Sequence, residues 1–105
     1  MLSALIAFTL LLAPATPSSP RSAFSSCLNK LVKSSLEKKI GQSDFDAQLP
    51  AACANEEDAF RKSVVATDMK NGISRKTSEQ GVSEEIADYI SSTKDRYREE
   101  AAAGG

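Results

Sequence analysis

The chain has 105 residues, of which 41% are hydrophobic, and its 13 basic and 14 acidic residues give a formal net charge of −1. This balance provides no general attraction to nucleic acid, and the absence of tryptophan argues against stacking platforms for bases or sugars. Histidine is also absent, which removes the commonest metal ligand and the commonest general base at neutral pH.

The chain begins with an apolar stretch from Leu2 to Ala13 that leads into the small-x-small sequence Ala13-Pro14-Ala15. This pattern is typical of a secretory signal peptide, although no Lys or Arg precedes it. The stretch is shorter than the ~20 apolar residues that span a membrane, so a retained anchor is the weaker alternative, and a lipid on Cys27 is weaker still. We expect residues 1–15 to be cleaved, and the mature protein to be periplasmic or secreted without membrane contact.

A linker and a first helix should follow. Pro17 and Pro20 fix the backbone within residues 16–21 and remove hydrogen-bond donors, which favours a linker. From about Ser22 onward, apolar or small side chains recur at three- and four-residue steps, the spacing of one helix face. These residues are Phe24, Cys27, Leu28, Leu31, Ser35 and Leu36. We expect Gly41 to end this helix, because glycine readily adopts the left-handed conformation.

Two further helix starts are visible. Ser43 predicts a short second helix, and Pro50 should kink it or open the next one, because proline cannot donate to a backbone carbonyl. The residues of this helix that recur at four-residue steps are Phe45, Leu49 and Cys53. Asn55 is followed by three acidic residues, which favours a new helix start there.

The last segment is compatible with helix from Glu56 almost to the end of the chain. Its weak points are Gly72 and Gly81, because glycine costs about 1 kcal/mol relative to alanine inside a helix. We expect one long, kinked helix, with a break at either glycine as the alternative. A single helical domain then covers residues 22–100, and residues 101–105 form a disordered tail.

Cys27 and Cys53 are the only cysteines of the chain. An exported chain meets an oxidising compartment, so we expect a structural disulfide rather than a redox pair or a zinc site. The midpoint between the two is Ile40, beside the expected helix end, which suits an antiparallel pair of arms joined by the sulfurs. The fold class is therefore all-α, a disulfide-stapled helical hairpin followed by a long C-terminal helix.

Four residues near the C-terminus form an expected partner surface, because the first helix is too short to cover the last one. They are Val82, Ile86, Tyr89 and Ile90. These side chains must either fold back onto the chain after a break or contact another chain. Basic and acidic blocks also alternate along the sequence. The alternation favours attraction between neighbouring helices of one chain, with a homodimer paired antiparallel near Thr77 as the alternative.

No residue set in the sequence specifies a reaction. Ser-x-x-Lys occurs at Ser35 and Ser91, but the partner motifs of the serine-acylating enzymes are missing. Glu84 and Asp88 lie one helical turn apart, without a second acidic cluster to complete a cation site. We therefore expect a non-enzymatic protein that needs no cofactor and no metal.

Several positions spread over residues 24–98 form a pattern. They are Phe45, Leu49, Cys53, Phe60, Asp68, Ser74-Arg75, Glu79, Asp88-Tyr89 and Arg96-Tyr97. In this pattern the chain resembles uncharacterised small two-cysteine helical exported proteins of Gram-negative bacteria. The resemblance implies a helical periplasmic protein and carries no particular activity.

Three functions are open at this point. The first is a non-enzymatic protein that acts in the cell envelope through contacts with an unknown protein partner. The second is a holdase-like periplasmic stress chaperone, because the chain is similar to the acid-stress chaperones in size, helicity and single disulfide. The third is an inhibitor of an envelope hydrolase.

Overall fold

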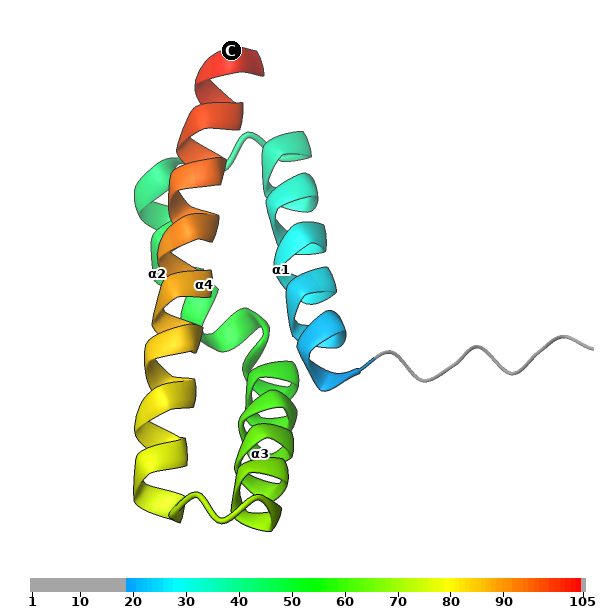
Figure 1. Ribbon diagram of the computed structural model, residues 1–105. Helices are drawn as coiled ribbons and strands as arrows, with labels where there is room; N and C mark the ends of the chain where they lie inside the picture. The colour runs from blue at the N-terminus through cyan, green and yellow to red at the C-terminus, as the bar shows by residue number, and fades with distance from the viewer. Residues whose placement is uncertain (1–18, 105) are drawn as a thin grey trace, which may run out of the picture.

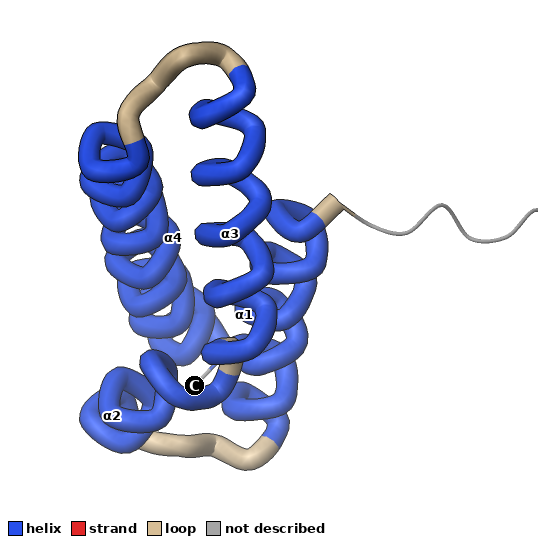
Figure 2. The backbone as a smooth tube through the Cα atoms, turned by 90° about the horizontal axis from the view of Figure 1, so that it is seen from below, coloured by secondary structure: helices blue, strands red, loops and turns tan. Residues whose placement is uncertain are grey.

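The computed structural model describes residues 19–104, which form four helices and no strand (Figure 1). The helices are α1 (Pro20–Glu37), α2 (Gln42–Ala52), α3 (Ala54–Lys70) and α4 (Arg75–Gly104). In Figure 1, α1 rises, α2 and α3 descend one after the other, and α4 rises along the full height of the molecule. Viewed from below in Figure 2, α1, α3 and α4 surround a common interior, and each of these three packs against the other two. The expected all-α fold and the long C-terminal helix are confirmed.

The core lies between the helices and contains one line of side chains from each. Its buried members are Phe24, Leu28, Val32, Phe45, Leu49, Cys53, Phe60, Val65, Val82, Ile86 and Tyr97. Stacked aromatic rings join distant parts of the chain, with ring centroids 3.9 Å apart for Phe45 and Tyr97 and 5.9 Å apart for Phe24 and Phe60. Such pairs contribute roughly 0.5–1.5 kcal/mol beyond the burial of their surface. The first of these ring pairs joins α2 to α4, and the second joins α1 to α3.

Helix α1 ends at Glu37, four residues before the expected glycine. Lys39 adopts the left-handed conformation with φ 55°, and the Ile40 N–H donates to the Ser35 carbonyl at 3.1 Å, which closes a Schellman turn. Gly41 has an ordinary φ of −64° and is the N-cap of α2. The expectation that Gly41 would end the helix is wrong, because Lys39 has already turned the chain.

The break between α3 and α4 is at Gly72, and the expectation of one long helix is wrong there. Gly72 has φ 86°, and the N–H of Ile73 donates to the Asp68 carbonyl at 3.0 Å. Ser74 then caps α4, since its hydroxyl oxygen accepts from the Thr77 N–H at 3.2 Å. Gly81, the other weak point, lies inside α4. Gly72 adopts the left-handed conformation and Ser74, two residues later, caps the next helix, so the chain reverses there, whereas Gly81 keeps a helical conformation.

The outer boundaries also differ from those expected. Pro20 is the first residue of α1, with Ser19 as the cap, so the helix begins inside the expected linker. At the other end α4 continues to Gly104 rather than stopping near residue 100, because the alanines at 101–103 have the highest helix propensity. The expected signal peptide, the first part of the linker and Gly105 lie outside the described residues.

The junction of α2 and α3 is a single residue, Cys53. Pro50 lies inside α2, two residues before its end, where it leaves one carbonyl of the preceding turn without a helical donor. Asn55 lies in the first turn of α3, just inside the boundary expected from the sequence. The descending arm of the fold is therefore two helices joined at the cysteine.

Candidate functional site

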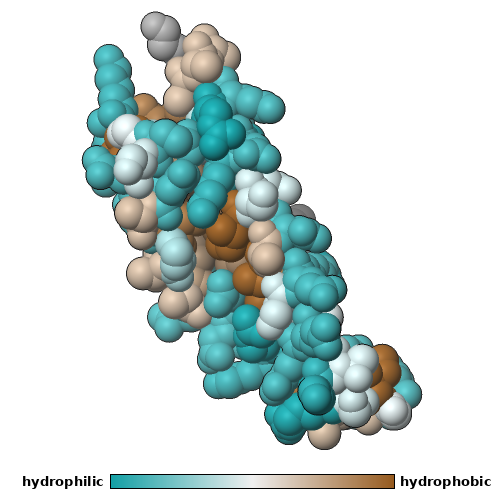
Figure 3. Space-filling model, turned by 90° about the vertical axis from the view of Figure 1, so that its left-hand side faces the viewer, coloured by the Kyte–Doolittle hydropathy of each residue, from teal (hydrophilic) through white to brown (hydrophobic). Residues whose placement is uncertain are grey.

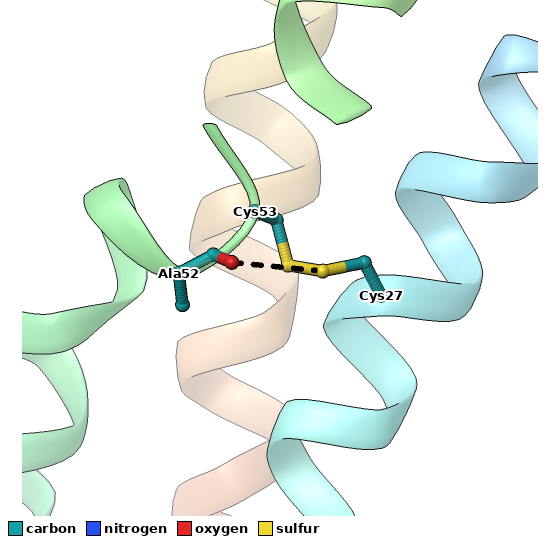
Figure 4. The surroundings of a disulfide bond; sticks show 3 residues. All are labelled: Cys27, Ala52 and Cys53. Carbon is teal, nitrogen blue, oxygen red and sulfur yellow. Dashed lines mark hydrogen bonds between the residues drawn. A yellow bond between two sulfur atoms is a disulfide. The ribbon is translucent and has the colours of Figure 1, made fainter. Parts of the chain in front are cut away.

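The disulfide between Cys27 and Cys53 is present, and it links the middle of α1 to the α2–α3 junction (Figure 4). The two Cα atoms are 6.0 Å apart, within the usual range for a disulfide. Cys53 is buried, Cys27 is half-buried, and the Cys27 Sγ lies 3.9 Å from the carbonyl oxygen of Ala52. The bond therefore fixes the junction against α1 and acts as a structural staple.

One cluster of residues with metal-ligand chemistry occurs within residues 19–104. The sulfurs of Cys27 and Cys53 and a carboxylate oxygen of Glu56 lie within 4.8 Å of one another. Both sulfurs are bonded to each other, so neither is available as the thiolate that binds a metal. A single carboxylate remains, and it does not make a metal site.

The expectation that four α4 side chains form a partner surface is wrong, because other parts of the same chain cover them. Val82 is 1% exposed and Ile86 is 5% exposed, while Tyr89 and Ile90 are partly buried against the core. The chain reverses at Gly72, so α3 packs along the first half of α4 and covers these side chains, which is the alternative in which they fold back after a break. These four side chains therefore give no support for a homodimer.

Tyr89 belongs to an aromatic cluster where the start of α1 meets α3 and α4. Its ring stands edge-on to Phe24 at 5.5 Å and to Phe60 at 6.1 Å between centroids. Arg21 covers the cluster, with its guanidinium 4.8 Å above the Phe60 ring, a hydrogen bond to the Tyr89 hydroxyl at 3.4 Å, and an ion pair with Glu85. The ion pair contributes little to stability, because the side chains of Arg21 and Glu85 are both partly exposed to solvent.

The residues weighed for catalysis do not form a reactive arrangement. Ser35 is buried, and its hydroxyl oxygen accepts from the Gln48 side-chain amide at 3.2 Å. Ser91, Glu84 and Asp88 are exposed on α4 and make no side-chain hydrogen bond or ion pair with residues 19–104. Ser35 is therefore part of the core, and the other three side chains lie on a solvated face of α4.

A groove lies at the upper end of the molecule, beside the last turns of α4. We call it the upper groove; its volume is about 540 Å³, and it is lined by Leu36, Lys39, Ile40, Tyr97, Glu100, Ala101 and Gly104. Leu36 and Ile40 are partly buried and pack against the core, so the groove has an apolar floor. The Tyr97 hydroxyl is directed to the carbonyl oxygens of Ser35, at 3.3 Å, and of Ile40, which fixes the turn beneath it.

A second exposed surface lies at the opposite end, around the α3–α4 turn. We call it the hairpin tip, and it comprises Met69, Lys70, Ile73, Arg75 and Lys76. Met69 is 44% exposed and Ile73 is 41% exposed, and they are the exposed large hydrophobic residues of the described chain. Figure 3 shows hydrophobic atoms at this lower end of the molecule with hydrophilic atoms around them. The sequence pattern assigned both residues to a continuous helix, so this surface was not expected.

No helix within residues 19–104 combines the length and the apolar character needed to cross a bilayer. Comparison of the chain with protein-family models, with curated proteins and with solved structures finds no match.

Proposed function

We propose that this protein is exported, has no catalytic activity, and acts in the cell envelope by binding a helix of a partner protein in the upper groove. Three features support the proposal. The apolar start of the chain is typical of a signal peptide, the fold is small and held by one disulfide, and the described residues bring no reactive groups together.

The observation that carries the proposal is that α4 loses its neighbour before it ends. Lower down, α1 lies along α4, where Arg96 donates to the Asn29 side-chain oxygen at 2.7 Å. Helix α1 ends at Glu37, whereas α4 continues to Gly104 and projects past the α1–α2 turn (Figure 1). A helix bound in the groove would take the position beside α4 that α1 occupies below.

The groove also has the chemistry of a helix-binding surface. Its floor is apolar, and the small residues Ala101 and Gly104 on α4 let another backbone approach closely. Lys39 and Glu100 are exposed and place one charge of each sign beside that floor. An amphipathic helix with its apolar face on the floor could therefore be oriented by its flanking charges.

Two variants on the same exposed stretch test the groove. Ala101→Arg places a long charged side chain in the groove, whereas Ala102→Arg adds the same side chain to an exposed neighbour that does not line it. The wild type and both variants are used to capture partners from envelope extract, and the captured proteins are quantified by mass spectrometry. We expect one partner to fall by at least about tenfold with Ala101→Arg only, which corresponds to the loss of about 1.4 kcal/mol of binding energy.

Two controls complete this test. Circular dichroism must show the same helix content for both variants, so that lost capture is not lost folding. The N-terminus of the protein from its native compartment is read by intact mass. Equal capture by both variants would reject the groove, and a chain that still starts at Met1 in the cytoplasm would reject export.

A further inference from the structure

We infer that the hairpin tip binds the surface of an anionic lipid bilayer, with Met69 and Ile73 entering the interface and the neighbouring cations facing the headgroup phosphates. This inference does not depend on the upper groove, which lies at the other end of the molecule. It departs from the expectation that the mature chain makes no membrane contact.

The exposed apolar residues lie at one end of the molecule. Met69 is in the last turn of α3, and Ile73 lies in the turn that follows it. That turn is the lowest point of the described fold in Figure 1, where α3 ends and α4 begins. The apolar groups therefore stand on a projecting end of the molecule, where a flat interface can reach them without any complementary cavity.

Basic side chains surround Ile73 in the sequence. Lys70, Arg75 and Lys76 are all exposed and lie within three positions of it along the chain. Lys70 and Lys76 form no ion pair with any residue between 19 and 104, so their charges are free for another partner. Basic residues beside exposed apolar ones are the composition that binds anionic lipid surfaces.

The acidic groups near the tip do not cancel this charge. Asp68 accepts a hydrogen bond from the Ser78 hydroxyl at 2.7 Å, and Glu79 lies 3.8 Å from the Arg75 guanidinium. Three cations at the tip thus face two acids, which leaves a net charge of +1, and neither lysine is in an ion pair within residues 19–104. The tip remains basic although the whole chain has a net charge of −1.

A second copy of the chain fits this surface poorly. Contact between two tips would bring like charges together, which is unfavourable. Elsewhere in residues 19–104 no large hydrophobic side chain is exposed. The upper groove has an apolar floor, but Lys39 and Glu100 place one charge of each sign beside it, so it is not an acidic surface that would attract the tip. An anionic bilayer supplies both an apolar interior and a negative surface.

The chain has no tryptophan, so a single introduced tryptophan is the only one to fluoresce and reports on its own surroundings. Ile73→Trp in the full chain reports on the tip alone, whatever the N-terminal residues do. We expect its fluorescence to shift to the blue with vesicles of equal phosphatidylglycerol and phosphatidylcholine, and to change little with phosphatidylcholine alone. Brominated lipids should quench the introduced tryptophan in the anionic vesicles.

Charge variants in the Ile73→Trp background test the lysines. Lys70→Glu/Lys76→Glu should weaken vesicle binding by on the order of 20-fold or more, since each cation near an anionic surface accounts for about fivefold. The matched control is Lys30→Glu/Lys33→Glu, which changes two exposed, unpaired lysines of α1 by the same charge. In this control, the size of the blue shift and the lipid concentration at its midpoint should stay within about twofold of the values for Ile73→Trp alone.

Three results would overturn the inference. The first is an equal blue shift with neutral vesicles, and the second is an equal loss of binding in both lysine pairs. The third is a blue shift that grows with protein concentration without vesicles, because a second copy would then cover the tip. Reporter Ala102→Trp at the upper end should show no blue shift, and its insertion would mean that the molecule binds by another surface.

Discussion

Removal of the disulfide tests how this small fold is held together. With 26 positions between Cys27 and Cys53, the chain-entropy relation gives about 3.5 kcal/mol at 25 °C for the cross-link. Replacement of both cysteines by alanine also removes a buried sulfur at position 53, which adds roughly 1 kcal/mol of lost packing. We therefore expect the double variant to lose about 4–5 kcal/mol of unfolding free energy. This corresponds to a fall in Tm of roughly 15–30 °C for a domain of this size.

Urea unfolding followed by circular dichroism at 222 nm measures this loss. The matched control is the reduced wild-type protein, which loses the cross-link and keeps both sulfurs. Its free energy of unfolding should therefore be about 1 kcal/mol higher than that of the double variant. The slope of the transition should increase in both, because an unfolded chain without the cross-link exposes more surface. A loss below about 1 kcal/mol in both proteins would refute the reasoning, since helix packing alone would then account for the fold.

Backbone conformation and one buried hydroxyl give three further predictions, each measured by the same urea unfolding. Gly72→Ala should destabilise the fold by about 1–2 kcal/mol, because alanine is strained at φ 86°. Gly81→Ala should stabilise the fold by up to about 1 kcal/mol, because alanine favours a helix more than glycine does and the added methyl group meets open space. Changes in stability of the opposite signs would contradict the assigned turn. Lys39→Gly should stabilise by about 1 kcal/mol, since φ 55° suits glycine, and a loss of stability would show that the lysine side chain matters more than its backbone. Tyr97→Phe should cost about 1 kcal/mol by removing the hydrogen bond to the carbonyls at the end of α1, and an unchanged midpoint would mean that this contact is not net stabilising.

The helical periodicity of α1 shows what local pattern can establish. Phe24, Leu28 and Ser35 of the face expected from the spacing are buried, and the other members of that face are partly buried against the core. Spacing therefore identified this face, although Val32, which is also buried, was not among the expected residues. The cysteine pairing could also be predicted, because a chain with two cysteines offers each of them one intramolecular partner, and the expected export favours their oxidation. Both conclusions require only short-range geometry or a count.

The chain reversal at Gly72 shows where local pattern fails. Gly72 and Gly81 have the same intrinsic cost in a helix, and the sequence offers a capping residue after each, Ser74 and Ser83. The difference is in tertiary packing, because Val82 and Ile86 are buried only when the helix is continuous past Gly81 and faces α3. The error about the partner surface followed from this one boundary.

The two candidate surfaces were beyond the reach of the sequence for a related reason. The upper groove exists because α1 stops while α4 continues, and the hairpin tip exists because α3 and α4 extend below α1. Each depends on how far one helix overhangs another. Spacing within a helix carries no information about that relation.

Local sequence patterns were enough to predict that this protein is helical, which face of each short helix is apolar, and which two sulfurs can form a disulfide. These properties follow from the 3.6-residue period and from the chemistry of individual side chains. Only the tertiary structure decided that Gly72 and not Gly81 turns the chain, that the α4 face is buried, and that Met69 and Ile73 are exposed. Exposure depends on the neighbours that long-range packing brings to each side chain, and a residue's own segment does not specify them.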